Sequence, residues 1–556
     1  MEALFLQEAR AHPIKRYWLH KTLCLNNLYG VDLMAEAAEI AKLRLFLKLA
    51  AQLDSASHIE PLPDLDFNIK SGNLLVGIAD AEDIDRRFSG RGVLPFGFDE
   101  VEDAVESAAV AYEEFVAIQD STDDQAALHR AKGLLRTRIG WITDQADRGL
   151  HKMRGDVVPL ETWRETHKPF HWFAEFPTFW RNGGFDVIIG NPPYIGLKGK
   201  RRKQFQYKWM GYEAGNCPDI YAVCTERATT LANANGRFAM IVMHSICFHK
   251  GFFVLREFLQ RRFAGIWIST YWGGRSGLFA GSAGVRNSIL IGKQGGKKIG
   301  IHTSIYRRWL TEGRDLLFPT LEYACPDQSL FAFGPSPMWP FVGPGPVLEA
   351  FTSLVGNDSQ LNNVLQQRSD FPLGYKTTAL YQLGVYKKEP PTVDPITRKP
   401  AYTSSQRSGW LYFENATQRN LALMVLAGRW AYLWWLAYGD EFDVTRGVLA
   451  ALPCDIERLS GAAASGGVPS DPPCDMELVS LVERLLACSE ALQLEMPNHI
   501  RWMVKAGVDV GRYDLGELRH LTDEADWLLA QAWGLSREQY DAAGNLRDRM
   551  TFGSRE

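Results

Sequence analysis

FDVIIGNPPY, residues 185–194, is the stretch of this sequence that decides the fold. Its first six residues form a compact apolar run, which is typical of a strand, and the chain then turns at two consecutive prolines. A segment with helical character at 219–232 and a second apolar run, FAMIVM at 238–243, come next. Because strands alternate with helices, the sequence predicts a parallel sheet of the α/β class.

The residues before this stretch continue the alternation. NLYGVD at 27–32 predicts a short buried strand that ends in an acidic residue, and residues 35–51 have helical character. FNIKSGNLLVGI at 67–78 predicts another strand and a turn. Residues 98–150 are rich in Glu, Ala, Gln and Arg with helical spacing, which predicts an inserted helical hairpin.

Length and composition describe an ordinary globular protein. The 556 residues exceed what one hydrophobic core holds, so we expect more than one domain. Apolar residues make up 46% and charged residues 23%, and the net charge of -4 does not by itself indicate a nucleic-acid binder. A basic patch can nevertheless occur on a chain that is acidic on average, so the total charge excludes little.

Cysteine and histidine usage indicates neither disulfides nor a metal site. The eight cysteines are scattered without a CxxC pair, which fits reduced thiols, and the twelve histidines show no ligand spacing. No apolar run is long enough for a membrane span and no signal peptide opens the chain. We therefore expect a cytoplasmic protein with no membrane partner and no metal.

The chemistry is carried by Asn191, Pro192, Pro193 and Tyr194. An aromatic amino group is a poor nucleophile because its lone pair is delocalised into the ring. An Asn side-chain oxygen and a neighbouring backbone carbonyl can accept hydrogen bonds from that group and orient it. Proline stiffens the turn that presents the carbonyl, and the Tyr194 ring offers a stacking face to a flipped base. The simpler alternative is a proline-rich turn after a strand, and the preceding apolar run favours the functional interpretation.

In this motif and its surroundings the chain resembles the gamma-class N6-adenine DNA methyltransferases. The similarity is to the long members found in type IIG restriction–modification and bacteriophage-exclusion systems, and it covers about residues 15–295. The segments that carry it follow one another in the family's order. They are NLYGVDLMAEAAEIAKLRLFL (27–47), IKSGNLLVG (69–77), GGFDVIIGNPPYI (183–195), DIY (219–221), NGRFAMIVMHS (235–245), LREFL (255–259) and LFAGSAGVRNSILIG (278–292).

The resemblance implies S-adenosyl-L-methionine as cofactor. Asp32 and Leu33 would bind its ribose and neighbouring groups, Asn73 and Leu74 its adenine, and Asn191 would contribute to the same site. A carboxylate at the carboxyl end of a strand is suited to ribose hydroxyls. Taken alone, Asp32 could equally be a helix N-cap, Asn73 a turn residue and the segment at 219–221 the start of a helix. The order and spacing of the segments favour the functional roles.

The resemblance also sets the expected domains. The fold is α/β: a Rossmann-like methyltransferase core, incomplete at its N-terminus, with a helical insertion and a C-terminal α+β target-recognition domain. Near residue 300 Gly, Pro and Trp become frequent, and a small-residue, proline-rich stretch at 459–473 is typical of a linker. The expected parts are the cofactor-binding part of the core (1–80), the insertion (81–180), the catalytic part (181–299), the target-recognition domain (300–458), the linker (459–475) and a C-terminal helical region (476–556).

One element of the family is missing. A Gly-rich loop normally follows the first strand and holds the methionine part of the cofactor, yet residues 1–27 contain no glycine. Three explanations remain open: a start inside the domain, a split enzyme completed by a partner chain that supplies the loop, or a degenerate paralogue retained for binding.

Double-stranded DNA is the expected partner. Five cations follow the catalytic motif, interleaved with three aromatic residues, and would neutralise phosphates; the alternative is a solvated loop. They are Lys198, Lys200, Arg201, Arg202 and Lys203. Further DNA-facing candidates lie in the second half of the chain: Arg307, Arg308, Arg398, Lys399 and Arg407. The tryptophans of the aromatic segment 430–447 are more consistent with core packing.

The sequence thus predicts methylation of adenine N6 in double-stranded DNA within a restriction–modification or phage-defence system. A non-catalytic DNA-binding or specificity subunit that keeps the methyltransferase fold is the alternative. Methylation of RNA or of a protein glutamine is a third possibility, because related NPPY enzymes act on both. No nuclease motif is evident, so DNA cleavage is not predicted.

Overall fold

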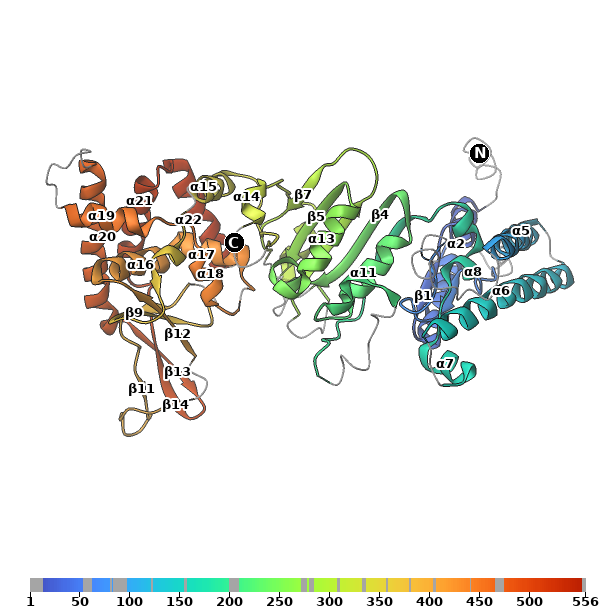
Figure 1. Ribbon diagram of the computed structural model, residues 1–556, viewed down its shortest axis with the longest axis horizontal. Coiled ribbons are helices and arrows are strands. Elements are labelled where there is room, and N and C mark those ends of the chain that lie inside the picture. The colour runs from blue at the N-terminus through green and yellow to red at the C-terminus, as the bar shows by residue number, and fades with distance from the viewer. Residues whose placement is uncertain are drawn as a thin grey trace. The chain divides into compact units, whose positions relative to one another are not determined.

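The structure is a computed structural model (Figure 1). It divides into two compact units. Unit 1 comprises residues 1–240 with 261–263 and 293–297, and unit 2 contains the remaining residues. The expected boundary between 299 and 300 lies inside unit 2. The residues described are 14–53, 63–80, 83, 98–121, 124–154, 158–199, 210–271, 278–279, 285–307, 311–332, 337–356, 359–379, 382–403, 407–440, 442–465 and 475–552.

Unit 1 begins with a small parallel pair of strands flanked by helices. Its elements are α2 (Lys15–Asn26), β1 (Gly30–Asp32), α3 (Ala35–Ala50) and β2 (Ile69–Ser71). The register pairs Gly30 with Ile69 and Asp32 with Ser71. The prediction of a buried strand at 27–32 was wrong in two respects. The strand has only three residues, and it is half-buried with Asp32 exposed, because β2 is its only strand partner among the described residues.

The predicted helical hairpin is confirmed. Helices α5 (Phe98–Ser121) and α6 (Gln125–Arg154) lie side by side in Figure 1. Three shorter helices follow in the same insertion: α7 (Leu160–His167), α8 (Trp172–Glu175) and α9 (Pro177–Arg181). Trp163 and Phe173 are fully buried in a cluster that also holds Leu150 of α6, so apolar packing fixes the insertion against the rest of the unit.

The stretch quoted first forms β3 (Phe185–Gly190), as predicted. It pairs in parallel with β4 (Ala232–Met243). This strand begins six residues before the apolar run at 238–243 that predicted it. The η3 turn (Glu213–Asn216) and α11 (Tyr221–Thr230) connect the two strands. At Gly190, the end of β3, the backbone lies close to the side chain of Met240: an added Cβ would be 2.6 Å from its sulfur, so that side chain would have to move.

The sheet continues through unit 2 in the order β3-β4-β6-β5-β7. The further strands are β5 (Gly265–Tyr271), β6 (Asn287–Lys293) and β7 (Gly300–Thr303), and β5 and β7 are parallel. The sheet therefore extends past residue 299. The helical segments before and after these strands are α12 (Ser245–Phe248), η4 (Lys250–Phe252), α13 (Phe253–Arg262), η5 (Thr311–Leu316), α14 (Gln328–Phe331), α15 (Pro346–Val355) and η6 (Leu361–Val364).

The C-terminal part of unit 2 holds two antiparallel sheets. One has the order β10-β9-β12-β8 and consists of β8 (Leu365–Gln366), β9 (Phe371–Lys376), β10 (Val385–Tyr386) and β12 (Ser408–Phe413). The other has the order β11-β14-β13 and consists of β11 (Thr392–Val393), β13 (Ile500–Lys505) and β14 (Val508–Tyr513). The expected C-terminal helical region at 476–556 does contain helices, and it also contains β13 and β14, which form a hairpin that pairs with the distant strand β11.

Helices fill the rest of unit 2. They are α16 (Ala416–Ala427), α17 (Arg429–Tyr438), α18 (Arg446–Ala450), α19 (Ile456–Ser465), α20 (Met476–Glu495), η7 (Met496–Asn498), α21 (Arg519–Ala532) and α22 (Arg537–Phe552). The predicted linker at 459–475 is corrected: its first seven residues belong to α19, and Asp475 caps α20. Residues 466–474 lie outside the described residues. The predicted core packing of Trp430, Trp434 and Trp435 is confirmed, since all three are buried.

Two further expectations concern the whole chain. No disulfide joins any two of the seven described cysteines, and Cys474 lies outside the described residues. Among the described residues no single helix is long and apolar enough to cross a membrane; α16 and α17 pass that test only together, and they are bent by 66°.

Candidate active site

The first half of the site lies where β1 ends. The carboxylate of Asp32 is exposed, and its Oδ1 accepts a hydrogen bond of 2.8 Å from the backbone N–H of Met34. Its backbone carbonyl accepts from Gly72 N–H, also at 2.8 Å. The N-cap position of α3 is Met34, so the alternative role of Asp32 as the helix N-cap is not observed. An exposed carboxylate therefore stands at a strand end, held by the turn that follows it.

A cavity of about 320 Å³ adjoins this turn. It is lined by Leu33, Ser71, Gly72 and Lys168, with Ala35 at the start of α3. Leu33 is 54% exposed although its side chain is wholly apolar. An apolar side chain beside a carboxylate at the carboxyl end of parallel strands is an arrangement that accommodates a nucleoside.

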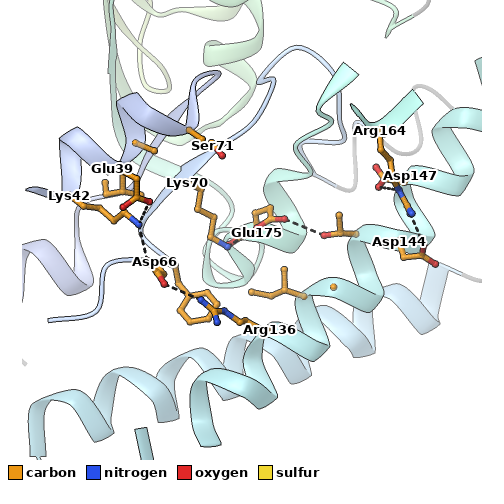
Figure 2. Close-up of a pocket in the computed structure, with 17 residues that line it drawn as sticks. Glu39, Lys42, Asp66, Lys70, Ser71, Arg136, Asp144, Asp147, Arg164 and Glu175 are labelled. Atoms are coloured by element: carbon orange, nitrogen blue, oxygen red, sulfur yellow. Dashed lines mark hydrogen bonds and ion pairs between the residues drawn. The ribbon is translucent and has the colours of Figure 1, made fainter. Parts of the chain in front are cut away.

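A larger cavity of about 850 Å³ lies against α3, β2 and α6 (Figure 2). Its charged groups neutralise one another: Lys70 points to Glu175 at 2.6 Å, and Asp66 lies between Lys42 and Arg136 at 2.8 and 3.1 Å. Hydrogen bonds from Lys132 and Lys42 outweigh burial and lower the pKa of Asp66 to about 2. Because the charged groups named here already pair with one another, they give no reason to expect a charged ligand in the larger cavity.

Asn73 is held inside its own turn. Its Nδ2 donates to the carbonyl of His167 at 3.1 Å, and its Oδ1 accepts from Leu75 N–H at 3.1 Å. Asn73 therefore stabilises its own turn, which is the alternative role considered from the sequence. A side-chain amide has two donor hydrogens and two acceptor lone pairs, so one of each remains for a ligand. The side chain of Leu74 packs against the hydrophobic core of unit 1.

A buried polar network fixes this turn and was missed by sequence reasoning. Asp147 of α6 accepts hydrogen bonds from His171 Nε2 at 3.0 Å and from Arg164 Nε at 2.7 Å. The other ring nitrogen of His171 accepts from Ile78 N–H at 3.2 Å, which assigns the proton to Nε2. The three side chains come from separate helices and loops, so no local pattern marks them as partners.

The second half of the site is the turn after β3. Asn191 and Pro193 are exposed, Pro192 is buried and Tyr194 is half-buried. The hydroxyl of Tyr194 donates to Asn191 Oδ1 at 3.1 Å. Burial, with a smaller contribution from the charge of Asp219, raises the pKa of Tyr194 to about 12, so the phenol keeps its proton and remains a donor. The Asn191 oxygen is thus oriented by its own motif and exposed.

Asp219 positions this turn. Its Oδ1 accepts from the backbone N–H of Ile195 at 3.0 Å and of Tyr221 at 3.2 Å, which joins the turn to the start of α11. Burial raises the pKa of its carboxyl above the usual value. The ring of Tyr221 meets that of Tyr194 edge to face, with centroids 6.1 Å apart. The segment 219–221 therefore starts a helix and also supports the turn after β3.

The two halves are joined through α11. Arg227 is fully buried, and its guanidinium donates to the carbonyl of Gly77 at 2.9 Å, to Asp83 at 3.0 Å and to the hydroxyl of Tyr212 at 2.7 Å. Gly77 follows the Asn73 turn and has a φ of 143°, with no room for a Cβ beside the carbonyl of Phe170. The helix after the motif thus holds the loop after β2. The described residues that line the two cavities include none of Asn191–Tyr194.

The predicted DNA-facing residues divide into three groups. Lys198 is exposed, whereas Lys200, Arg201, Arg202, Lys203 and Arg308 lie outside the described residues. In unit 2 Lys399 and Arg407 are exposed. Arg398 is engaged within the protein, at 2.6 Å from Asp509 and with its guanidinium 4.7 Å from the ring of Trp502, and Arg307 donates to the carbonyl of Thr320.

Comparison with known proteins gives one family match. Residues 26–268 match the Eco57I restriction-modification methylase family, within the span of the sequence resemblance. The "Putative type II restriction enzyme and methyltransferase" of Methanocaldococcus jannaschii is 27% identical over 277 residues, which are 40% of this chain and 22% of that protein. The chain thus matches about a fifth of that relative's length. These findings support the resemblance to restriction–modification methyltransferases.

Similar solved structures share little sequence with this chain. The DrdV–DNA complex is 13% identical, covering 45% of this chain and 31% of that one, with a TM-score of 0.23. The type IIG restriction endonuclease BpuSI is 12% identical; the match covers 98% of this chain and 79% of that one, also with a TM-score of 0.23. Scores this low support no placement of residues on either structure.

Proposed function

We infer that this chain is the catalytic and DNA-facing part of an S-adenosyl-L-methionine-dependent DNA methyltransferase that acts on adenine N6. We assign it to a restriction–modification or phage-defence system. The observation that carries the proposal is the Asn191–Tyr194 motif at the end of a parallel strand, with its amide oxygen exposed and oriented. The family match over residues 26–268 supports the same conclusion.

The residues of the motif have separate roles in this proposal. Asn191 Oδ1 and the Pro192 carbonyl accept hydrogen bonds from the adenine amino group and orient it for attack, and the Tyr194 ring stacks on the flipped base. When bound, the cofactor supplies an electrophilic methyl group on a sulfonium. The amino nitrogen gains that methyl and loses one proton, so the reaction needs no oxidant and no metal.

The residues present fit the adenosine part of the cofactor. Asp32 and Leu33 would bind the ribose and neighbouring groups, and Asn73 and Leu74 would contact the adenine; of these four residues, Leu33 lines the 320 Å³ cavity. Among the described residues no glycine-rich turn follows a strand beside this site in a position to hold the methionine part. The fit is therefore partial: the described residues account for the adenosine part of the cofactor and leave its methionine part unassigned.

Cations next to the motif would hold the target strand. Lys198 is exposed directly after the turn, and the sequence adds four more cations by residue 203. Each would neutralise a phosphate, so we expect binding to double-stranded DNA that weakens as salt rises. Lys399 and Arg407 of unit 2 are further candidates for DNA contact.

The test is the substitution Asn191→Ala. We expect it to abolish labelled methyl transfer to DNA while leaving DNA affinity nearly unchanged, because Asn191 contacts the reacting base and no phosphate in this proposal. Lys198→Ala is the matched variant, and it should weaken DNA binding while leaving the chemistry intact at saturating DNA. Equal loss of binding and transfer in Asn191→Ala would contradict the assigned role.

A non-catalytic DNA-binding subunit is the second candidate. It is favoured by the incomplete cofactor site, since the described residues complete only the adenosine part. Retained DNA binding without cofactor binding or methyl transfer, under every condition including addition of a partner chain, would establish it.

A further inference from the structure

Lys168 occupies an unusual backbone position beside the 320 Å³ cavity. It ends α7, and its φ of 46° lies in the left-handed region. Its backbone N–H donates to the carbonyl of Arg164 at 2.8 Å, which closes the last turn of the helix. A helix end of this kind favours Gly or Asn, because other side chains are disfavoured in the left-handed region. The local conformation therefore does not account for a lysine at this position.

Backbone contacts hold Lys168 against the turn that contains Asn73. The carbonyl of Lys168 accepts from Asn73 N–H at 2.7 Å, and Phe170 N–H donates to the carbonyl of Val76 at the same distance. Pro169 forms an isolated parallel bridge with Asn73. The end of the helical insertion thus runs beside this turn, and the positions of Lys168 and Asn73 are coupled.

The ammonium group of Lys168 remains available to a ligand. Its side chain is exposed and lines the 320 Å³ cavity together with Arg164 and Asp147. Those two residues pair with each other at 2.7 Å, and Arg164 also pairs with Asp144 at 2.6 Å. Within the described part of the chain the Lys168 side chain has no such partner. Lysine therefore brings to this cavity hydrogen-bond donors that no described protein group uses.

The neighbouring groups indicate which ligand atoms these donors would serve. In the proposed cofactor site the Asp32 carboxylate only accepts hydrogen bonds, so it suits the hydrogens of the ribose hydroxyls. The Asn73 amide has one donor hydrogen left after its contacts within the turn. The adenine ring carries several acceptor nitrogens, more than this one hydrogen can serve. A further donor beside Asn73 would therefore be used by the adenine ring.

We propose that Lys168 is a cofactor-binding residue whose ammonium donates a hydrogen bond to a ring nitrogen of the cofactor's adenine. The helical insertion then contributes directly to the cofactor site, although Lys168 lies outside every segment that carries the resemblance to the methyltransferase family. The identity of the ligand rests on the proposed function, whereas the position of Lys168 in the cavity lining does not.

The first test is calorimetric binding of methylthioadenosine to the purified full chain without DNA. This nucleoside is the adenosine part of the cofactor without its amino acid. We expect Lys168→Asn to weaken binding about tenfold or more, because a charge-assisted hydrogen bond is lost. Lys168→Arg should lose much less, since the guanidinium also donates. Lys152→Asn is the matched control and should bind normally: Lys152 is exposed in the last turn of α6 and lines neither cavity.

Thermal unfolding without ligand separates this role from a purely structural one. Asn tolerates the left-handed region better than Lys does. The melting temperature of Lys168→Asn should therefore stay within about 2 °C of that of the unsubstituted chain, or rise, while its affinity falls. A lower melting temperature together with the loss of affinity would mean that the substitution disturbs the turn, and would overturn the assignment.

Deaza analogues of methylthioadenosine test the contact itself. In each analogue one ring nitrogen is replaced by CH and the rest of the nucleoside is unchanged. We expect one of them to bind the unsubstituted chain about tenfold more weakly than methylthioadenosine does. That difference should disappear in Lys168→Asn, because the donor is already absent. Penalties that are the same in both proteins for every analogue would overturn the contact.

The outcomes distinguish this inference from the proposed function. Methylthioadenosine binding that Lys168→Asn leaves unchanged would overturn the role of Lys168 and leave the proposed function intact. Absence of binding of both methylthioadenosine and S-adenosyl-L-methionine to the unsubstituted chain would contradict the proposed cofactor, and the role of Lys168 with it.

Discussion

Two apolar stretches of this molecule differ in how far their side chains are buried. All ten residues of RWAYLWWLAY in α17 are buried inside unit 2. In FDVIIG of β3, by contrast, Val187 and Ile189 are 61% and 76% exposed. Both stretches have the composition of a core element, yet among the described residues only α17 is covered within its own unit. Apolar composition alone therefore does not determine whether a segment is buried.

The largest effect should come from truncating the covered stretch. Trp434 is 1% exposed, its ring contacts that of Tyr438 with centroids 4.1 Å apart, and its Nε1 donates to the Val448 carbonyl at 3.0 Å. We expect Trp434→Ala to lower the free energy of unfolding of unit 2 by about 3–5 kcal/mol, measured by urea denaturation. Trp502→Ala is the control at a half-exposed tryptophan and should cost about 1 kcal/mol or less. Equal costs for the two variants would contradict the burial of α17.

The turn after β3 should be stabilised by its contacts with Asp219, whereas the exposed face of β3 has no comparable contacts among the described residues. Asp219→Ala removes the acceptor of two backbone N–H groups, and we expect a loss of about 2–3 kcal/mol in the free energy of unfolding of unit 1. Asp219→Asn keeps an acceptor oxygen and should cost less. No loss in Asp219→Ala would mean that the turn is held by other contacts.

The same residue predicts a pH dependence. Its folded pKa is raised above 3.8 by burial, so the folded state binds the proton more tightly than the unfolded chain. The contribution of protonated Asp219 to the free energy of unfolding is fully present below pH 3.8. It is lost as the pH rises through the raised pKa of Asp219 in the folded state. The stability of the unsubstituted chain relative to Asp219→Asn should therefore fall over that interval. A difference that does not vary with pH would contradict the raised pKa.

Much of unit 1 was predictable because its signals are local. The strand at 185–190, the hairpin of α5 and α6 and the turn after β3 each follow from composition and spacing within one segment. The hairpin of β13 and β14 was missed because it pairs with β11, which is more than 100 residues away and only two residues long. The small-residue stretch at 459–465 resembled a linker, yet it forms a helix because Ile456 and Leu459 are buried.

The site was predictable only in part, because some of its contacts join segments that are far apart in the sequence. Asn191 and Asp32 follow strands and belong to recognisable motifs. Asp147, Arg164 and His171 are brought together from separate segments, and only the fold makes them partners. The exposure of Val187 is likewise a property of the assembled unit, since the sequence of β3 alone predicts burial.

A smaller effect should follow from Tyr194→Phe. The variant keeps the stacking ring but removes the hydroxyl that donates to Asn191 Oδ1. We expect kcat for methyl transfer to fall by about tenfold, since one orienting hydrogen bond is worth roughly 1.4 kcal/mol in the barrier. DNA affinity should not change. An unaltered kcat would mean that this hydrogen bond does not orient the amide during the reaction.

The smallest effect should be Val187→Ala in the chain alone. Because this side chain is already exposed, the free energy of unfolding should change by no more than about 0.5 kcal/mol. A loss comparable to that of Trp434→Ala would show that β3 is covered within the chain and would remove the contrast between the two stretches.

The most direct measurement is transfer of a labelled methyl group from S-adenosyl-L-methionine to mixed genomic DNA by the purified chain, with and without the product of the upstream gene. We predict transfer to adenine N6 in the complete mixture, and none with Asn191→Ala in the same mixture. Absence of transfer from the complete mixture, with DNA binding retained, would contradict the assignment of this chain as a methyltransferase.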